Sequence, residues 1–262
     1  MQSSTEALRE AIENSNNIVF FGGAGVSTES GIPDYRGPKG LYTQKNGRCT
    51  PPPSLNMKLF KDAPENFFDY YRKHMLSWNA EPNAAHYKLA ELEKQGKLKA
   101  VITQNIDGLH QAAGSKNVIE LHGSMKSNHC IVCRKSYDVS EIRETTGVPH
   151  CKICGGLIKP DVVFFGEKLD KAVLNKAKKY IRAADMLIVG GTSLVVNPAV
   201  SLTYEFKGKT LAMINLAQTA LDGRADIVIH DKIGKVLASI SKTDCFPHPP
   251  ISPEQGAIAP EE

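Results

Sequence analysis

The chain has 262 residues, 41% hydrophobic and 23% charged, an ordinary composition for a globular protein. This length suits one large domain with a small module. A net charge of +4 argues against a dedicated nucleic-acid binder, and no apolar run is long enough to span a membrane. The residues from Met1 to Thr5 lead into a polar segment, so we expect no signal peptide. The mixed charge and the lack of addressing motifs leave the cytoplasm as the default location, and we expect a monomer without dedicated membrane binding.

Short apolar runs alternate with helical patterns along most of the chain. Ser4 or Thr5 is expected to cap a first helix that runs to about Asn14. The apolar runs that predict buried strands lie at 18–21, 100–103, 118–121, 186–189, 211–214 and 227–229. The helical patterns between them lie at 84–94, 170–184, 198–206 and 233–240. This alternation predicts an α/β fold with a Rossmann-like, doubly wound parallel sheet.

Three segments interrupt this alternation. Residues 33–53 are rich in glycine, proline and polar residues and predict a long functional loop. A cysteine-containing stretch at 124–159 is expected to form a small inserted zinc-ribbon module, and the proline-rich residues 243–262 a disordered tail. The remaining segments, 1–123 and 160–242, are assigned to the large α/β domain.

Two Cys-x-x-Cys pairs, Cys130 with Cys133 and Cys151 with Cys154, have the spacing of a tetrahedral structural zinc site. Four thiolates complete the coordination shell, so the metal is expected to hold the fold together and to take no part in chemistry. Redox dithiols or disulfides are the alternative. They are less favoured because a redox motif needs one pair, and because the cysteines of a protein without an export signal are expected to be reduced.

A glycine-rich turn follows the first predicted strand. Gly23, Ala24 and Gly25 open a helix, where free N–H groups and a partial positive charge favour a diphosphate. Thr28 stands at the third glycine position of the dinucleotide fingerprint, so the match is partial and an ordinary strand-to-helix turn also explains it. Ser27 and Thr28 add hydroxyl donors.

Polar residues follow other predicted strands. Gly190–Ser193 form a second glycine turn, as expected of a strand-end crevice that binds a nucleotide. Asn215 is placed to bind a ribose, or equally to end its strand as a turn residue. The segment 104–107 offers donors and acceptors for an amide-bearing ligand, although Asn105 or Asp107 acting as a helix N-cap is the simpler explanation.

Among the histidines, His122 has the most suggestive position. It ends a predicted strand, precedes Gly123 and belongs to the crevice side of the sheet. A neutral imidazole there could act as general base for a hydroxyl. A surface histidine is the plain alternative, and a zinc ligand is disfavoured because the four cysteines already complete a coordination shell.

Taken in order, these motifs resemble those of the sirtuins, a family of NAD-dependent protein lysine deacylases. The resemblance extends from about residue 15 to 240. It rests on 23–36, 104–107, His122-Gly123, the cysteine pairs, 160–167 and 191–194.

The resemblance implies NAD and one structural zinc as cofactors, and protein deacetylation as the activity. The acyl-lysine oxygen attacks C1′ of the nicotinamide ribose, releasing nicotinamide and then O-acetyl-ADP-ribose and free lysine. His122 is implied as general base, with Asn105 and Asp107 as further catalytic residues. The NAD contacts that the resemblance implies are Gly23, Ala24, Gly25, Thr28, Ile32, Tyr35, Arg36, Gln104, Asn105, Ile106, Asp107, His122, Gly191, Thr192, Ser193, Asn215, Lys232 and Ile233.

The resemblance also implies how substrate binds. Acetyl-lysine proteins are expected to add a β-strand to the chain, along Val162, Val163, Phe164, Phe165 and Gly166.

Two departures from the family bear on chemistry. Tyr35 stands where most relatives have phenylalanine. Phe68 and Tyr71 stand where desuccinylating relatives carry tyrosine and arginine, so acetyl and other uncharged acyl groups are expected.

Three other functions remain open at this point. A zinc-ribbon nucleic-acid binder would leave the glycine turns unexplained. A hydride-transferring dehydrogenase would need an acidic residue where 41–45 stand. Mono-ADP-ribosyl transfer shares the first step of deacetylation and differs in its acceptor.

Overall fold

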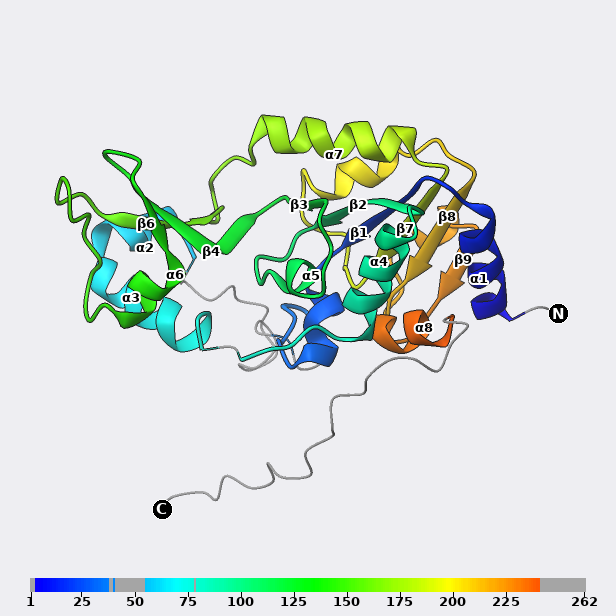
Figure 1. The fold of residues 1–262 in the computed structure, drawn as a ribbon, viewed down its shortest axis with the longest axis horizontal. Helices are drawn as coiled ribbons and strands as arrows, with labels where there is room; N and C mark the ends of the chain where they lie inside the picture. Colours follow the sequence, from blue (N-terminus) through cyan, green and yellow to red (C-terminus); the bar gives the residue numbers. More distant parts are fainter. Residues whose placement is uncertain (1–2, 38–39, 41–54, 78, 241–262) are drawn as a thin grey trace, which may run out of the picture.

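The structure is a computed structural model that describes residues 3–37, 40, 55–77 and 79–240. Most of the predicted loop at 33–53 and the predicted tail at 243–262 therefore lie outside the described residues. The described chain forms a large parallel sheet with helices on both faces and a smaller antiparallel sheet beside it (Figure 1).

The large sheet has six strands, all parallel, in the order β3-β2-β1-β7-β8-β9. Its strands are β1 (Ile18–Gly22), β2 (Leu98–Thr103), β3 (Val118–Glu120), β7 (Met186–Gly190), β8 (Thr210–Ile214) and β9 (Ile227–Ile229). Each predicted strand is present, and the order is that of dinucleotide-binding sheets, with the switch point beside β1. The predicted fold class is confirmed.

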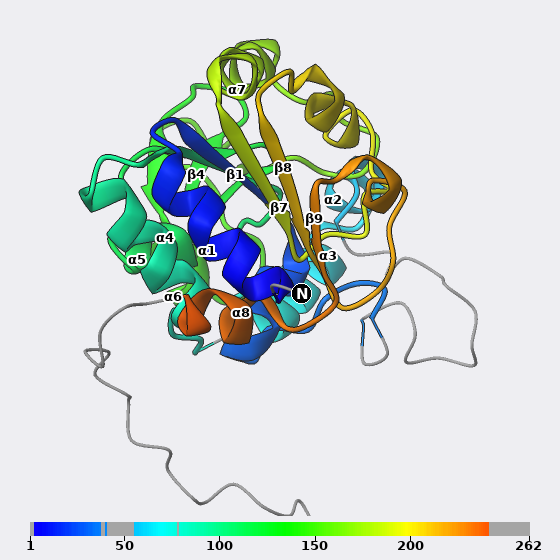
Figure 2. The ribbon, with the colours of Figure 1, turned by 90° about the vertical axis from the view of Figure 1, so that its right-hand side faces the viewer.

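Helices cover both faces of this sheet, as Figures 1 and 2 show. One face packs on α1 (Ser4–Asn14), α4 (Ala84–Lys94) and α8 (Ile233–Ser239), and the other on α7 (Lys171–Ala183) and the 3₁₀ helix η2 (Val200–Glu205). Alternate residues of β1 point to opposite faces: Phe20 belongs to the first core and Phe21 to the second. Burial on both faces explains why the strands are continuously apolar.

Two local predictions need correction. Ser3, not Ser4 or Thr5, caps α1, because its hydroxyl accepts the Glu6 N–H at 3.2 Å. The helix predicted over 198–206 is the 3₁₀ helix η2, which spans a shorter range.

Three further short helices are η1 (Ala24–Ser30), α5 (Leu109–Ala112) and η3 (Asp222–Arg224).

The cysteine module is a three-stranded antiparallel sheet in the order β5-β4-β6. Its elements are β4 (Gly123–Cys130), β5 (Ser136–Asp138), α6 (Val139–Glu144) and β6 (Ile158–Val162). Since β4 and β6 extend past the predicted limits of 124 and 159, the module's strands continue into the segments that flank it.

Two helices that the sequence analysis did not predict complete this lobe. Helices α2 (Met57–Asp62) and α3 (Pro64–His74) share a hydrophobic core with the module (Figure 1). Fully buried Phe60, Phe67, Phe68 and Tyr71 form its aromatic centre. Their helical spacing, with Pro64 at a helix start, was the available signal. Residues 57–74 therefore pack with the module and not with the large sheet.

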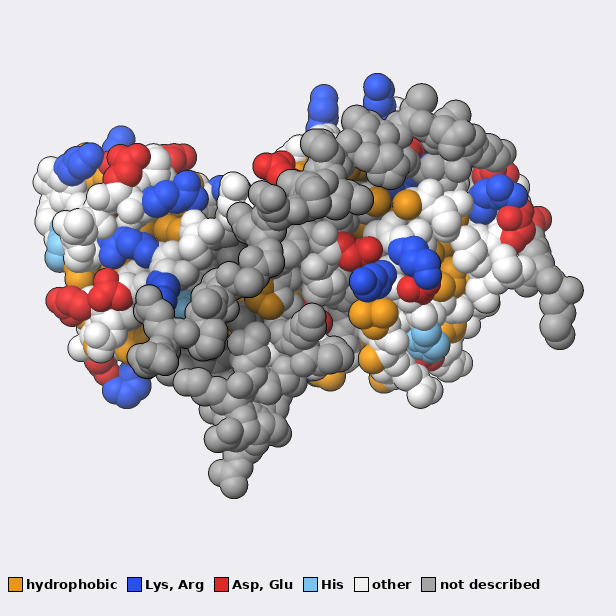
Figure 3. Space-filling model, turned by 90° about the horizontal axis from the view of Figure 1, so that it is seen from below, with side chains coloured by type: hydrophobic (Ala, Val, Ile, Leu, Met, Phe, Trp, Pro, Cys, Tyr) orange, Lys and Arg blue, Asp and Glu red, His pale blue; other side chains and the backbone are white. Residues whose placement is uncertain are grey.

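The surface agrees with the small net charge. On the face shown in Figure 3, the basic and acidic side chains of the described residues are interspersed. Within the described ranges, no helix combines the length and the apolar character needed to cross a membrane.

Candidate active site and zinc centre

A cavity of about 420 Å³ opens at the carboxyl ends of the parallel strands, a size within the usual range for ligand sites. The ends of β1, β2, β7 and β8 contribute to it, and so does the segment after β6. All of the residues predicted to contact NAD or substrate line this one cavity. The fold therefore brings together segments that are far apart in the sequence.

The two glycine turns meet at the base of this cavity. The Gly25 N–H donates to the Gly191 carbonyl at 2.8 Å, and a Cβ on Gly25 would lie only 2.8 Å from the Gly191 Cα. Gly191 itself has a φ of +59°, which favours glycine. The turn opens the 3₁₀ helix η1, not an α-helix. Gly25 thus serves the close approach of two backbones, and its N–H is already engaged.

Asp107 is the centre of a buried polar network. Its Oδ2 accepts the Ser27 hydroxyl at 2.7 Å, and the Asn105 Nδ2 donates to the same hydroxyl oxygen at 3.0 Å. Its Oδ1 accepts the Leu109 N–H at 3.0 Å, but the N-cap residue of α5 is Gly108 and not Asn105 or Asp107. The hydroxyl of Ser27, which the sequence analysis offered as a phosphate donor, instead orients Asp107.

Two further side-chain hydrogen bonds order the turns after β1 and β7. The Thr28 hydroxyl donates to the Gly25 carbonyl at 2.9 Å. The Gln104 Nε2 donates to the Thr192 hydroxyl at 3.1 Å. The first bond lies within η1, and the second joins the carboxyl ends of β2 and β7, which flank β1 in the sheet.

His122 is held by a main-chain acceptor. Its Nδ1 lies 2.8 Å from the Gln104 carbonyl oxygen, and because a carbonyl only accepts, Nδ1 carries the proton. The other nitrogen, Nε2, is then the basic atom of the neutral ring. Burial lowers the pKa of His122 below its ordinary value, against the opposing effect of the Gln104 hydrogen bond. The imidazole is therefore held in the neutral form that a general base requires.

The predicted substrate segment already uses its amide groups. The Val163 N–H donates to the His122 carbonyl at 2.9 Å, and the Phe165 N–H to the Leu55 carbonyl at 2.8 Å. The Phe164 N–H donates to Glu167 Oε2 at 2.7 Å. An added strand would therefore bond mainly to carbonyl groups of this segment.

The two phenylalanines of this segment have different surroundings. Phe164 is 1% exposed and packs on Phe60 and Phe67, whereas Phe165 is 53% exposed at the cavity.

The cavity lining also includes Asn215, Lys232 and Ile233. The Asn215 Nδ2 donates to the Ala217 carbonyl at 2.8 Å, so this side chain also orders the turn after β8. Glu29, which the sequence analysis did not single out, accepts the Gly234 N–H at 2.7 Å and ties η1 to the start of α8.

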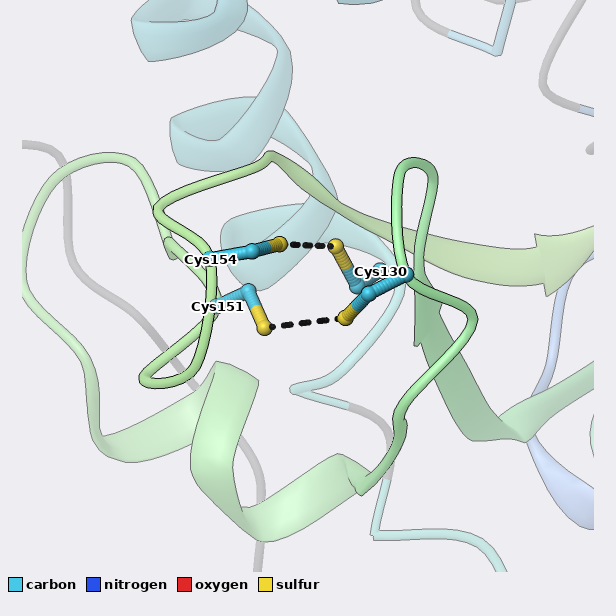
Figure 4. A group of neighbouring side chains, drawn as sticks. Cys130, Cys151 and Cys154 are labelled. Carbon is cyan, nitrogen blue, oxygen red and sulfur yellow. Dashed lines mark hydrogen bonds between the residues drawn. The ribbon is translucent and has the colours of Figure 1, made fainter.

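The cysteines form a compact cluster whose sulfurs face one another (Figure 4). The four Sγ atoms lie within 4.8 Å of one another, with Cys130 to Cys154 at 3.4 Å and Cys133 to Cys151 at 3.5 Å. A tetrahedron with Zn–S bonds of about 2.3 Å has S···S edges of about 3.8 Å, close to these values. The thiols are free, so the disulfide alternative finds no support.

The two knuckles have the same backbone geometry. The Arg134 N–H donates to the Cys130 carbonyl and the Gly155 N–H to the Cys151 carbonyl, at 3.0 and 2.9 Å. Arg134 and Gly155 both have positive φ, at 62° and 71°. The Tyr137 hydroxyl donates to the Cys151 Sγ at 3.1 Å, and this bond, together with backbone N–H donors of the knuckle, lowers the pKa of that thiol to about 6. The cluster is poised to bind a structural zinc ion through thiolates.

Comparison with known proteins agrees with this geometry. The profile of the Sir2 family matches residues 23–198. The chain is 54% identical over 242 residues to a NAD-dependent protein deacetylase of Clostridium perfringens, covering 92% of this chain and 99% of the relative.

Two solved structures are also similar. A serine-to-alanine variant of a Sir2 homologue with ADP-ribose has a TM-score of 0.82 and 41% identity, covering 90% of this chain and 94% of that one. A Sir2 variant with a deacetylated p53 peptide and 3′-O-acetyl-ADP-ribose has a TM-score of 0.79 and 38% identity, covering 89% and 95%. The chain belongs to the Sir2 family, and its curated relatives are NAD-dependent protein deacetylases.

The zinc centre yields the first prediction. Cys130→Ala should lower the zinc content well below one ion per chain and the thermal midpoint by roughly 10 °C or more, because zinc binding contributes directly to folding. Metal analysis and thermal unfolding measure both effects. Cys245→Ala, outside both pairs, is the control. A Cys130→Ala chain with wild-type zinc content and midpoint would contradict the structural role.

Proposed function

We propose that the chain is a NAD-dependent protein lysine deacetylase with His122 as its general base. The observation that carries this proposal is the position of the neutral His122 imidazole, held by the Gln104 carbonyl in the cavity that the two glycine turns also line. Its curated relatives are NAD-dependent protein deacetylases, and the chain is an enzyme of this type.

Different groups of cavity residues suit different parts of NAD. The polar network of Asn105, Asp107 and Ser27 lies where an amide needs both donors and acceptors. The glycines of the two turns have no side chains, so a diphosphate can approach the backbone there. When bound, NAD would supply the electrophilic C1′ of its nicotinamide ribose, to which the acyl-lysine oxygen would bond as nicotinamide leaves. Transfer of the acyl group to the ribose with uptake of one water would then give O-acetyl-ADP-ribose and free lysine.

The chain's own contribution is to place the reactants and to move one proton. His122 Nε2 takes the proton of a ribose hydroxyl, while Nδ1–H stays bonded to the Gln104 carbonyl and fixes the ring. The Ser27 hydroxyl donates a hydrogen bond to the Asp107 carboxylate and limits its rotation. Ile32 and Ile106, both largely buried, line the cavity and restrict access of water.

The protein substrate is an acetyl-lysine chain bound along Val162–Gly166. A Sir2 structure in complex with a deacetylated peptide supports a peptide site in this family. In this chain, the added strand would use the carbonyl groups of Val163 and Phe165, because the N–H groups of 163–165 donate elsewhere. Recognition of main chain accommodates many substrate sequences.

We also infer a cytoplasmic, monomeric enzyme without dedicated nucleic-acid binding. Zinc binding by four cysteines needs reduced thiols, which supports a reducing compartment. Light scattering of the purified protein measures the oligomeric state.

The proposed function is tested by nicotinamide release. Wild-type protein should release nicotinamide from NAD only with an acetyl-lysine peptide, and His122→Ala should lower product formation roughly 10²- to 10⁴-fold while NAD still binds. His74→Ala, which changes an exposed histidine of α3, is the matched control. Turnover retained in His122→Ala would exclude it as the base, and peptide-dependent release without deacetylation would indicate ADP-ribosyl transfer.

The pKa of His122 predicts the pH profile. A general base acts in its neutral form, which exists above its pKa, and burial lowers that pKa below the ordinary value for histidine. The acid limb of kcat/KM should therefore lie below pH ~6.5, the ordinary pKa of histidine. Initial rates across pH measure the profile. An acid limb at or above that pH would contradict a buried neutral base.

The acyl group is the third test. Phe68 and Tyr71 are fully buried in the aromatic core, and the cations that line the cavity among the described residues, Arg36 and Lys232, are both assigned to NAD. A succinyl carboxylate would lack a charged partner, so kcat/KM for succinyl-lysine should be roughly 10- to 100-fold below that for acetyl-lysine. A propionyl peptide of the same sequence is the neutral control. Equal rates for acetyl and succinyl peptides would show an unassigned cation at the acyl group.

A further inference from the structure

A buried lysine stands directly behind the proposed substrate segment. Lys159 on β6 is 7% exposed. Its Nζ donates to the Val162 carbonyl at 2.8 Å and the Pro160 carbonyl at 3.2 Å. The same ammonium lies 3.9 Å from the centre of the Phe164 ring. Every one of these partners belongs to the strand that leads into the segment or to the segment itself.

Glu167 closes the other end of the segment. Its Oε2 lies 3.2 Å from the Lys159 Nζ and also accepts the Phe164 N–H at 2.7 Å. Its own N–H donates to the Phe164 carbonyl at 2.9 Å. Gly166, with a φ of +91°, makes the turn between them. One carboxylate oxygen therefore joins the buried ammonium to the backbone of the segment.

Burial of the ion pair between Lys159 and Glu167 carries a desolvation cost. Burial lowers the pKa of Lys159, and Glu167 opposes that effect, which shows that the charged form is disfavoured by its surroundings. An unbranched apolar side chain of similar length would fill the same volume without the desolvation penalty. The ammonium adds directed bonds to main-chain oxygens, which an apolar side chain cannot make.

We propose that Lys159 and Glu167 are positioning residues that hold Val162–Gly166 in the conformation that receives the acetyl-lysine peptide. This inference rests on the proposed function, because it takes that segment as the peptide site. Lys159 acts through the segment and not by contact with substrate. Its polar contacts all fall within 160–167, whereas the predicted NAD residues lie outside this segment. Loss of the pair should therefore weaken peptide binding selectively.

The experiment measures peptide and NAD affinity separately. In Lys159→Met, the Kd of a fluorescent acetyl-lysine peptide should rise about tenfold, while the Kd of NAD changes by less than about twofold. The KM for peptide should rise with it, with kcat retained at saturating peptide. Lys159→Arg keeps the charge and should recover most of the affinity.

Lys152→Met is the matched control, because Lys152 is an exposed lysine of the same module paired with Glu141. It should leave both affinities unchanged. Glu167→Gln, at a less buried position, keeps an acceptor for the Phe164 N–H and removes the charge. It should give a smaller rise in peptide Kd and provides the measurement if Lys159→Met does not fold.

The outcomes separate the two proposals. Unchanged peptide affinity in Lys159→Met, or in Glu167→Gln if the first variant does not fold, overturns the positioning role. Peptide and NAD affinities that fall together also overturn it, since the lysine would then support the whole fold. A wild-type protein that neither binds the acetyl-lysine peptide nor consumes NAD overturns the proposed function itself, whatever the variants do.

Discussion

The site depends on one close approach, between the turn after β1 and the turn after β7. Neighbouring parallel strands end at the same edge of the sheet, so both turns arrive there together. Their backbones then come so near that a Cβ on Gly25 would meet the Gly191 backbone at 2.8 Å. Glycine at these positions lets the cavity floor consist of main chain, which leaves room for a cofactor above it.

The smaller lobe meets a different constraint. A unit as small as this sheet buries little apolar surface by itself, so it gains from a metal site and from packing against helices. Two features of this chain stabilise the smaller lobe. The cysteine cluster cross-links the two knuckles through the metal it is poised to bind, and α2 and α3 cover the sheet with an aromatic core. Cys130 and Cys151 belong to that same core, so metal binding and hydrophobic packing stabilise one unit.

The sequence predicted features with local causes. Strands buried on both faces read as continuous apolar runs, and the cysteine spacing is itself the zinc motif. Features that depend on distant contacts were missed or misassigned. The hydroxyl of Ser27 looked like a phosphate donor because its partner, Asp107, lies far along the chain. Likewise, the sequence does not show that Leu55 accepts the Phe165 N–H, because that contact joins segments far apart in the chain.

The cysteine module and the proposed catalytic histidine share one pair of strands. Strand β4 begins immediately after His122 and ends at Cys130, while β6 runs from Ile158, opposite Cys130, to Val162, opposite Gly123. Where the two strands meet at the cavity, the Val163 N–H donates to the His122 carbonyl at 2.9 Å. The proposed general base and the proposed substrate segment thus lie at one end of the antiparallel pair of β4 and β6, and the other end of this pair adjoins the cysteines. A metal bound by the cysteines would therefore help to fix the strand pair that positions His122 and Val163.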